Sequence, residues 1–233
     1  MPSVSIRKFE PPEADCAETS KARTILKHAH DAAEGFIDSF SAVRRDRGAG
    51  QGTTRDEEQD LLRASVVFAA AGLDSTLKQL IRDGLPRLVQ VDEDVRNGLE
   101  TFIARQLRGE PGDGEAAAGR RFLAKILAAP SRLDELIEQY ILDLTGSSLQ
   151  SADELAKASV ALGLKVAEIG IDKSGLKPIF DIRNQIIHEL DIKLTAPNRN
   201  RASRSRAAMV RHSNTLLELG ERILLAVEAK FEA

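Results

Sequence analysis

The sequence has only one cysteine, Cys16, and four histidines. One thiol cannot form an internal disulfide, and so few cysteines and histidines do not supply the spaced ligands of a structural zinc site. Tryptophan is absent, and aromatic residues make up 4% of the chain. Alternating runs of β-branched and aromatic residues, which are typical of strands, are correspondingly scarce. These absences argue against a disulfide-stabilised fold, a zinc module and a β-sheet protein.

Long apolar runs and a strong net charge are missing as well. The longest apolar run, residues 66–73, is much shorter than the roughly 20 residues that cross a bilayer. Residues 1–15 lack the apolar core of a signal peptide, so we predict a cytoplasmic protein without membrane contact. Lysine and arginine number 33 against 36 for aspartate and glutamate, which leaves a net charge of −3. The chain as a whole therefore has no basic field that would attract nucleic acid.

The dominant pattern in the chain is helical. Apolar residues recur at spacings of three and four, and breaks rich in glycine or proline separate these stretches. The pattern predicts an all-α protein with helices over 17–45, 57–84, 92–108, 115–128, 132–145, 152–163, 178–192 and 203–231. We expect residues 1–15 to form a flexible tail and 16–55 an N-terminal helix and loop. Residues 56–233 would form a helical domain, joined with 16–55 in one globular unit.

The segment 178–192 has an unusual distribution of polar residues. On an ideal helix, at about 100° per residue, an apolar stripe contains Ile179, Ile182, Ile186 and Leu190. Arg183 falls inside this apolar arc. A guanidinium cannot lose its charge, so burial requires an anion or hydrogen-bond acceptors. Asn184 and His188 are four residues apart and share a different face.

Asp74 is a candidate anion for Arg183. It interrupts an apolar stripe of the helix predicted over 57–84, whose other members are Val67, Ala70, Leu77 and Ile81. Two opposite charges on the buried faces of two helices favour pairing, so we predict an Asp74–Arg183 contact that orients the guanidinium. The alternative is that Asp74 lies at the edge of the stripe and reaches water.

The pattern Arg183-Asn184-x-x-x-His188 resembles the Arg-x4-His motif of the HEPN superfamily, whose members include ribonucleases and toxins. The surrounding sequence LKPIFDIRNQIIHELDI is similar to the family's motif helix, and residues 63–81 are similar to the long helix against which that helix packs. The resemblance covers about residues 56–231, although only the six-residue motif is specific. It implies a HEPN-like bundle of antiparallel long helices and a two-fold homodimer.

The resemblance also implies an activity, which is metal-independent and cofactor-independent cleavage of RNA. Arg183 and His188 lie about 140° apart around an ideal helix, so a composite site from two protomers suits the pair. His188 would move a proton at the ribose 2′-OH or the leaving 5′-oxygen, and Arg183 would stabilise the phosphate charge. Asn184 would orient the phosphate or His188. The alternatives are a surface histidine and an exposed asparagine without function.

A basic segment follows the motif. No acidic residue occurs between Asp191 and Glu218, whereas six cations do. These predicted RNA-binding residues are Lys193, Arg199, Arg201, Arg204, Arg206 and Arg211. Without aromatic side chains in the segment, binding would be mainly electrostatic and salt-sensitive. The alternative is a flexible, solvated loop.

Three functional hypotheses remain open at this point. The first is an endoribonuclease of stress response, toxin–antitoxin systems or phage defence, with an antitoxin or regulatory protein as a possible partner. Some HEPN toxins carry a tyrosine two residues after the motif histidine, where an antitoxin modifies them, but Leu190 occupies that position here. The second is a non-catalytic HEPN-like RNA-binding, nucleotide-binding or scaffold protein. The third is a helical adaptor in which the motif is coincidental.

Overall fold

The computed structural model describes residues 5–12, 16–48, 53–108, 115–195 and 197–232, and only the backbone of 115–117. Regular structure in these ranges is α-helical, apart from one isolated antiparallel bridge between Ile192 and Arg201. The helices are α1 (Ala17–Asp46), α2 (Asp56–Val91), α3 (Glu93–Arg108), α4 (Glu115–Ala128), α5 (Arg132–Thr145), α6 (Ala152–Ala161), α7 (Lys173–Glu189) and α8 (Arg206–Glu232). The predicted all-α class is confirmed for the described residues.

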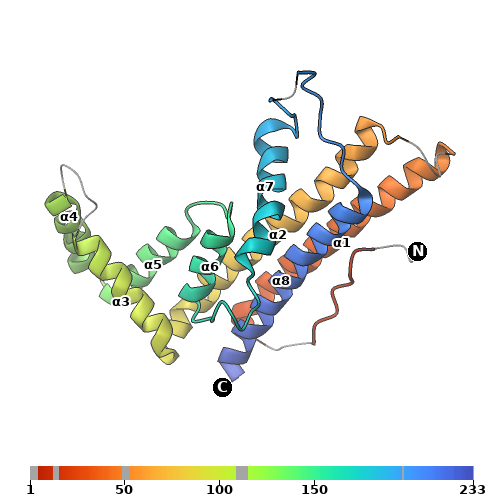
Figure 1. Cartoon of the computed structure of the whole chain (residues 1–233). Coiled ribbons are helices and arrows are strands. Elements are labelled where there is room, and N and C mark those ends of the chain that lie inside the picture. The colour runs from red at the N-terminus through yellow and green to blue at the C-terminus, as the bar shows by residue number, and fades with distance from the viewer. Residues whose placement is uncertain (1–4, 13–15, 49–52, 109–114, 196, 233) are drawn as a thin grey trace.

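Three long helices, α1, α2 and α8, pack lengthwise and form the body of the molecule (Figure 1). Helices α2 and α8 begin side by side, where the Gln59 side chain bonds the backbone of Arg204. Helix α1 runs in the opposite direction, and its first turns meet the end of α8 through Arg23 and Glu228. The buried face of α2 is mostly leucine and small residues, which allow the helix backbones to approach closely.

The approach of α1 to α2 is closest at Gly72. A Cβ atom at this position would lie 2.2 Å from Ala29 Cβ, so even one methyl group requires backbone movement. We expect Gly72→Ala to lower the free energy of unfolding by about 1–3 kcal/mol through overpacking. Gly35→Ala is the matched control, because nothing lies within 4 Å of its Cβ position on the exposed side of α1. This control should gain about 0.5–1 kcal/mol in urea unfolding, and equal effects of the two would contradict the close packing.

Helices α3, α4 and α5 form a lobe that projects from one end of the body, while α6 and α7 lie between this lobe and the start of α8 (Figure 1). Ser151 caps the start of helix α6, since Ser151 Oγ accepts from the Glu154 N–H at 3.2 Å. The Glu154 carboxylate bonds the N–H of Gln150, one residue before the position that a capping box requires. One continuous hydrophobic core includes residues of the lobe, of α6 and α7, and of the three long helices.

Two prolines lie inside helices, which the sequence analysis did not predict. Helix α2 continues through Pro86 to Val91 because Leu85, Leu88 and Val89 are buried, and their packing outweighs the cost of one lost backbone hydrogen bond. Helix α7 begins at Lys173, ahead of Pro178, because the Asp172 side chain caps it. The helix also ends earlier than expected, at Glu189 rather than 192.

Residues 5–12 belong to the predicted flexible tail, but they pack along α1 and α8. Ile6 is 4% exposed and is part of the core. Asn214 on α8 binds the backbone of Ser5 and Arg7, and the His30 ring bonds the Arg7 carbonyl. The expectation of a loose segment is therefore wrong for these residues, because their backbone groups find partners on two helices. Across the described helices, none combines the length and the apolar character that crossing a membrane requires.

Candidate functional site

The motif arginine is a partly buried cation with unused donors. Arg183 lies on α7, and its Nη1 donates to Asn184 Oδ1 at 2.9 Å. Its Nε is buried and has no hydrogen-bond partner among the described residues. No carboxylate from the described chain pairs with the guanidinium. An unpaired guanidinium at this depth is costly, and a phosphate would supply the anion that it lacks.

His188 lies exposed in the last turn of α7. It forms no hydrogen bond or ion pair with any residue in the described ranges, so the imidazole is free to meet a ligand. Three exposed apolar residues lie within six positions of it in the sequence: Ile187, Leu190 and Leu194, with exposed fractions of 42%, 64% and 60%. Arg183 and His188 therefore share one helix, but an ideal helix places them on faces about 140° apart.

Asp74 does not form the ion pair with Arg183 that we predicted. Its carboxylate pairs with Lys78 one helical turn later, at 3.0 Å, and accepts a hydrogen bond from the Leu149 N–H at 3.1 Å. The next residue, Gln150, accepts from Asn184 Nδ2 at 3.0 Å. Asp74 is thus only indirectly connected to the motif, through the turn before α6. It competes poorly for the guanidinium because both of its oxygens already have nearer donors.

The end of α7 is a tight turn formed by two residues with left-handed backbone conformation. Leu190 has a φ of 52° and Asp191 a φ of 61°, and neither is glycine. The Asp191 N–H closes the turn on the Gln185 carbonyl at 3.0 Å. Such conformations cost on the order of 1–2 kcal/mol for each residue, so neighbouring contacts must hold them in place. These contacts come from the Asp191 side chain.

Asp191 is fully buried between two arginines. Arg63 Nε donates to it at 2.9 Å, and Arg204 Nη2 at 2.5 Å. Burial by itself raises the pKa of the Asp191 carboxyl, but hydrogen bonds from Arg204 and Arg63 outweigh it and lower the pKa below its usual value. Arg63 also donates to the Ala202 carbonyl at 2.8 Å. This Arg63–Asp191–Arg204 cluster ties the end of the motif helix to α2 and to the segment that leads into α8.

Two of the predicted RNA-binding arginines face inward, which corrects the interpretation of the basic segment. Arg204 belongs to the buried cluster, and Arg201 pairs with Asp60 at 2.5 Å and bonds the Leu190 carbonyl at 3.1 Å. Carboxylates on α2 and in the turn after α7 neutralise both, although the segment itself contains none. The exposed cations that remain are Lys193, Arg199 and Arg211. Arg206 is half-buried and has a partner.

The sequence analysis missed the buried cluster. Arg63 is 3% exposed and lies at core spacing with Val66, Ala70 and Leu73, all of them buried. That spacing is the same signal that drew attention to Arg183, and it was present in the sequence. Asp191 gave no such signal, because its burial depends on the left-handed turn rather than on helical periodicity.

A cavity of about 500 Å³ opens beside Asn184, between the starts of α6 and α7. Its cations are already paired, since Lys173 contacts Asp153 at 2.6 Å and Lys177 contacts Asp181 at 2.7 Å. In the ranges that the structure covers, no group of three acidic, histidine or cysteine side chains is placed to hold a metal ion. Comparison of the chain with protein-family models, with curated proteins and with solved structures found no match.

Proposed function

We propose that this protein is a metal-independent endoribonuclease of HEPN type that acts as a homodimer. The observation that supports the proposal is the state of Arg183, a partly buried guanidinium with a buried Nε that has no partner in the described chain. Other arginines of low exposure, such as Arg23 and Arg63, each have a carboxylate partner. An arginine that the protein leaves without an anion suits an anionic substrate, and RNA supplies phosphate.

The chemistry follows from the two motif side chains. His188 takes the proton of a ribose 2′-OH, whose oxygen attacks the adjacent phosphorus while the bond to the 5′-oxygen breaks. Solvent water protonates that leaving oxygen, and the imidazolium of His188 releases its proton to solvent, which leaves a 2′,3′-cyclic phosphate and a 5′-OH. Arg183, steadied by Asn184, stabilises the charge on the pentacoordinate phosphate with paired N–H donors. None of these steps needs a metal.

A two-fold dimer brings Arg183 and His188 from separate helices toward one phosphate. Ile187, Leu190 and Leu194 are exposed apolar residues within six positions of His188 in the sequence, and a dimer interface at the end of α7 would bury them. Exposed Lys193, Arg199 and Arg211 would then guide the RNA backbone. The cellular setting that we propose is stress response, toxin–antitoxin pairing or phage defence, with an antitoxin or regulatory protein as partner.

The test is an RNA cleavage assay in EDTA with chemical mapping of the fragment ends and a parallel measurement of oligomeric state. We expect cleavage by a dimer, with cyclic-phosphate and 5′-hydroxyl ends. A dimer that binds RNA without cutting it would support the non-catalytic RNA-binding or scaffold alternative. A monomer that neither binds nor cuts RNA would leave only the helical adaptor hypothesis.

A further inference from the structure

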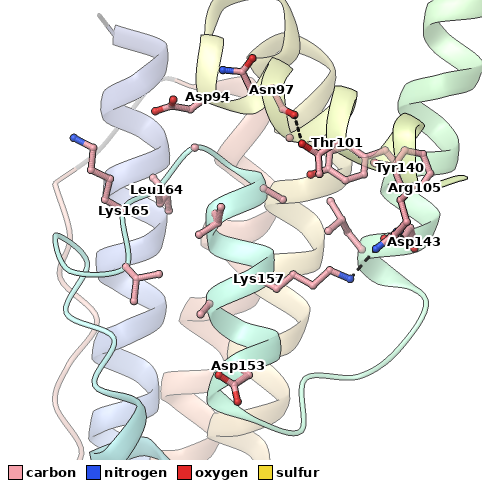
Figure 2. A pocket seen from close by; sticks show the side chains of 18 of the residues that line it. Asp94, Asn97, Thr101, Arg105, Tyr140, Asp143, Asp153, Lys157, Leu164 and Lys165 are labelled. Carbon is pink, nitrogen blue, oxygen red and sulfur yellow. Dashed lines mark hydrogen bonds and ion pairs between the residues drawn. The ribbon is translucent and has the colours of Figure 1, made fainter. Parts of the chain in front are cut away.

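A second cavity, of about 790 Å³, lies where the α3–α5 lobe meets α6 (Figure 2). Its walls come from α3, α5, α6, the turn that follows α6 and Lys173, the first residue of α7; the motif residues Arg183, Asn184 and His188 do not line it. Cavities between about 300 and 1,000 Å³ accommodate small organic molecules and cofactors. The size and the position at the junction of two packed units are therefore those of a ligand site.

The deep wall of this cavity is aromatic. Phe102 on α3 and Tyr140 on α5 are 4% and 6% exposed, and their rings lie 5.0 Å apart at a tilt of 31°. Val160 on α6 also lines the cavity and is 54% exposed, so it offers apolar surface to a molecule bound there. A flat ring between these surfaces would remove Val160 from water and stack against Phe102 or Tyr140.

The Tyr140 side chain is 6% exposed, and its hydroxyl, which forms no hydrogen bond with a described residue, is accessible from the cavity. Gly98 on α3 faces this hydroxyl. A Cβ atom added to Gly98 would lie 3.1 Å from the hydroxyl oxygen. A hydroxyl at a cavity wall bonds water when the cavity is empty of ligand, and a bound molecule with a polar atom can replace that water. This hydroxyl is therefore a donor available to a molecule in the cavity.

The rim of the cavity carries an excess positive charge on one side. Arg105 and Lys157 both approach the single carboxylate of Asp143, at 2.7 Å and 3.7 Å (Figure 2). Arg105 also lies over the Phe102 ring, 5.5 Å from its centroid. Lys157 is the looser of the two cations, so one positive charge above the aromatic wall is available to an anion. Elsewhere on the rim, Lys173 is matched by Asp153 and Lys165 by Glu168, while Asp94 adds a negative charge at the α3 side.

We propose that this cavity binds a planar aromatic molecule that carries one anionic group. The ring lies against Phe102, Tyr140 and Val160, and the anion contacts Lys157 with support from Arg105. The Tyr140 hydroxyl donates to a polar atom of the ring or its substituent. This site is separate from the motif on α7, and the proposal does not depend on ribonuclease activity.

The probe is anilinonaphthalene sulfonate, a fluorescent aromatic monoanion, titrated into the full chain. Tyr140 is the only tyrosine and tryptophan is absent, so tyrosine emission originates at this cavity. We expect one saturable site, with a change in Tyr140 emission over the same concentration range as the probe signal. Lys157→Ala and Val160→Asp should each weaken binding about tenfold, through loss of the cation and gain of a repelling carboxylate.

Two exposed control positions separate this site from nonspecific binding. Lys165→Ala removes a cation from the far rim, and Leu127→Ser removes a 56% exposed leucine from α4, outside the cavity. Both should change the affinity by less than about twofold. The proposal would be overturned by binding of the probe at several weak sites or by Tyr140 emission that does not change. It would also be overturned if Leu127→Ser lowered the affinity for the probe as much as Val160→Asp. Because Lys157 and Val160 are exposed, their substitution leaves the fold intact, which thermal unfolding checks.

Discussion

Replacement of Asp191 by asparagine is expected to lower the free energy of unfolding by about 3–5 kcal/mol, the usual cost of breaking a buried ion pair by removing one partner. The cost arises because the buried guanidinium of Arg63 stays charged after its partner is removed. Arg63 is 3% exposed and would keep its charge with only Asp60 and a carbonyl as partners. The two left-handed residues at the end of α7 would also lose the contact that holds them. Urea unfolding of the purified chain measures the loss.

Asp60→Asn is the matched control, because Asp60 pairs with the same Arg63 but has a side chain that is 53% exposed. Its loss should cost no more than about 1 kcal/mol. A second substitution, Arg63→Met, should recover part of the stability of Asp191→Asn by removing the unpaired charge. Similar costs for the two aspartates would show that the buried cluster contributes little.

The same cluster predicts a pH dependence with a definite sign. The pKa of Asp191 is lower in the folded chain than in the unfolded chain, so its ionised form stabilises the fold. That contribution is complete above the unfolded value of about 3.9 and is lost as the pH falls below it toward the folded pKa. The difference in stability between wild type and Asp191→Asn should therefore be constant near neutral pH and should shrink below about pH 4. A difference that persists unchanged at lower pH would contradict this assignment.

Replacement of His188 by alanine is expected to reduce RNA cleavage by a factor of about 10² to 10⁴, the range for loss of a general acid or base. Because His188 is exposed and has no partner in the described chain, the variant should unfold within about 0.5 kcal/mol of wild type. A loss of activity with unchanged stability would assign the histidine to the chemistry. Initial rates on a labelled RNA in EDTA provide the measurement.

His28→Ala is the control for this experiment, since His28 is an exposed histidine on α1, a different helix. It should cleave RNA at the wild-type rate. Arg183→Lys keeps the charge but loses the planar pair of donors, so its cleavage should fall by more than about tenfold. Equal rates for His188→Ala and wild type would assign the cleavage to a contaminant or to another site, and the proposed mechanism would fail.

Most of the fold could be predicted from the sequence because helical periodicity is a local signal. Six helices both begin and end within a few residues of their predicted limits, and the larger errors occur near prolines, in α2 and α7. The helix predicted over 57–84 ends before Pro86, but burial of Leu85 and Leu88 continues α2 through the proline to Val91. Residues 5–12 were expected to be loose because no repeating pattern reveals a segment that docks through its backbone on His30 and Asn214.

The candidate site was harder to predict because its contacts depend on distant parts of the chain. The motif places Arg183, Asn184 and His188 on one helix, and periodicity is sufficient for that. The partner of Asp74 is a backbone N–H in the turn before α6, which no charge pattern indicates. The charge of the basic segment was overestimated for a similar reason, because Arg201 is neutralised by Asp60, which is remote in sequence. Local composition therefore overestimated the charge available to RNA.

The arrangement of the long helices has a consequence for synthesis of the chain. Helix α8 covers faces of α1 and α2, yet α3 to α7 are all translated between α2 and α8. During translation, the leucine-rich face of the α1–α2 hairpin stays exposed to water until α3 to α7 and then α8 have been synthesised. The Asp191 cluster also forms late, because Arg63 is translated long before Asp191 and Arg204. Molecular chaperones that recognise exposed apolar helices would bind this incomplete chain rather than the folded protein.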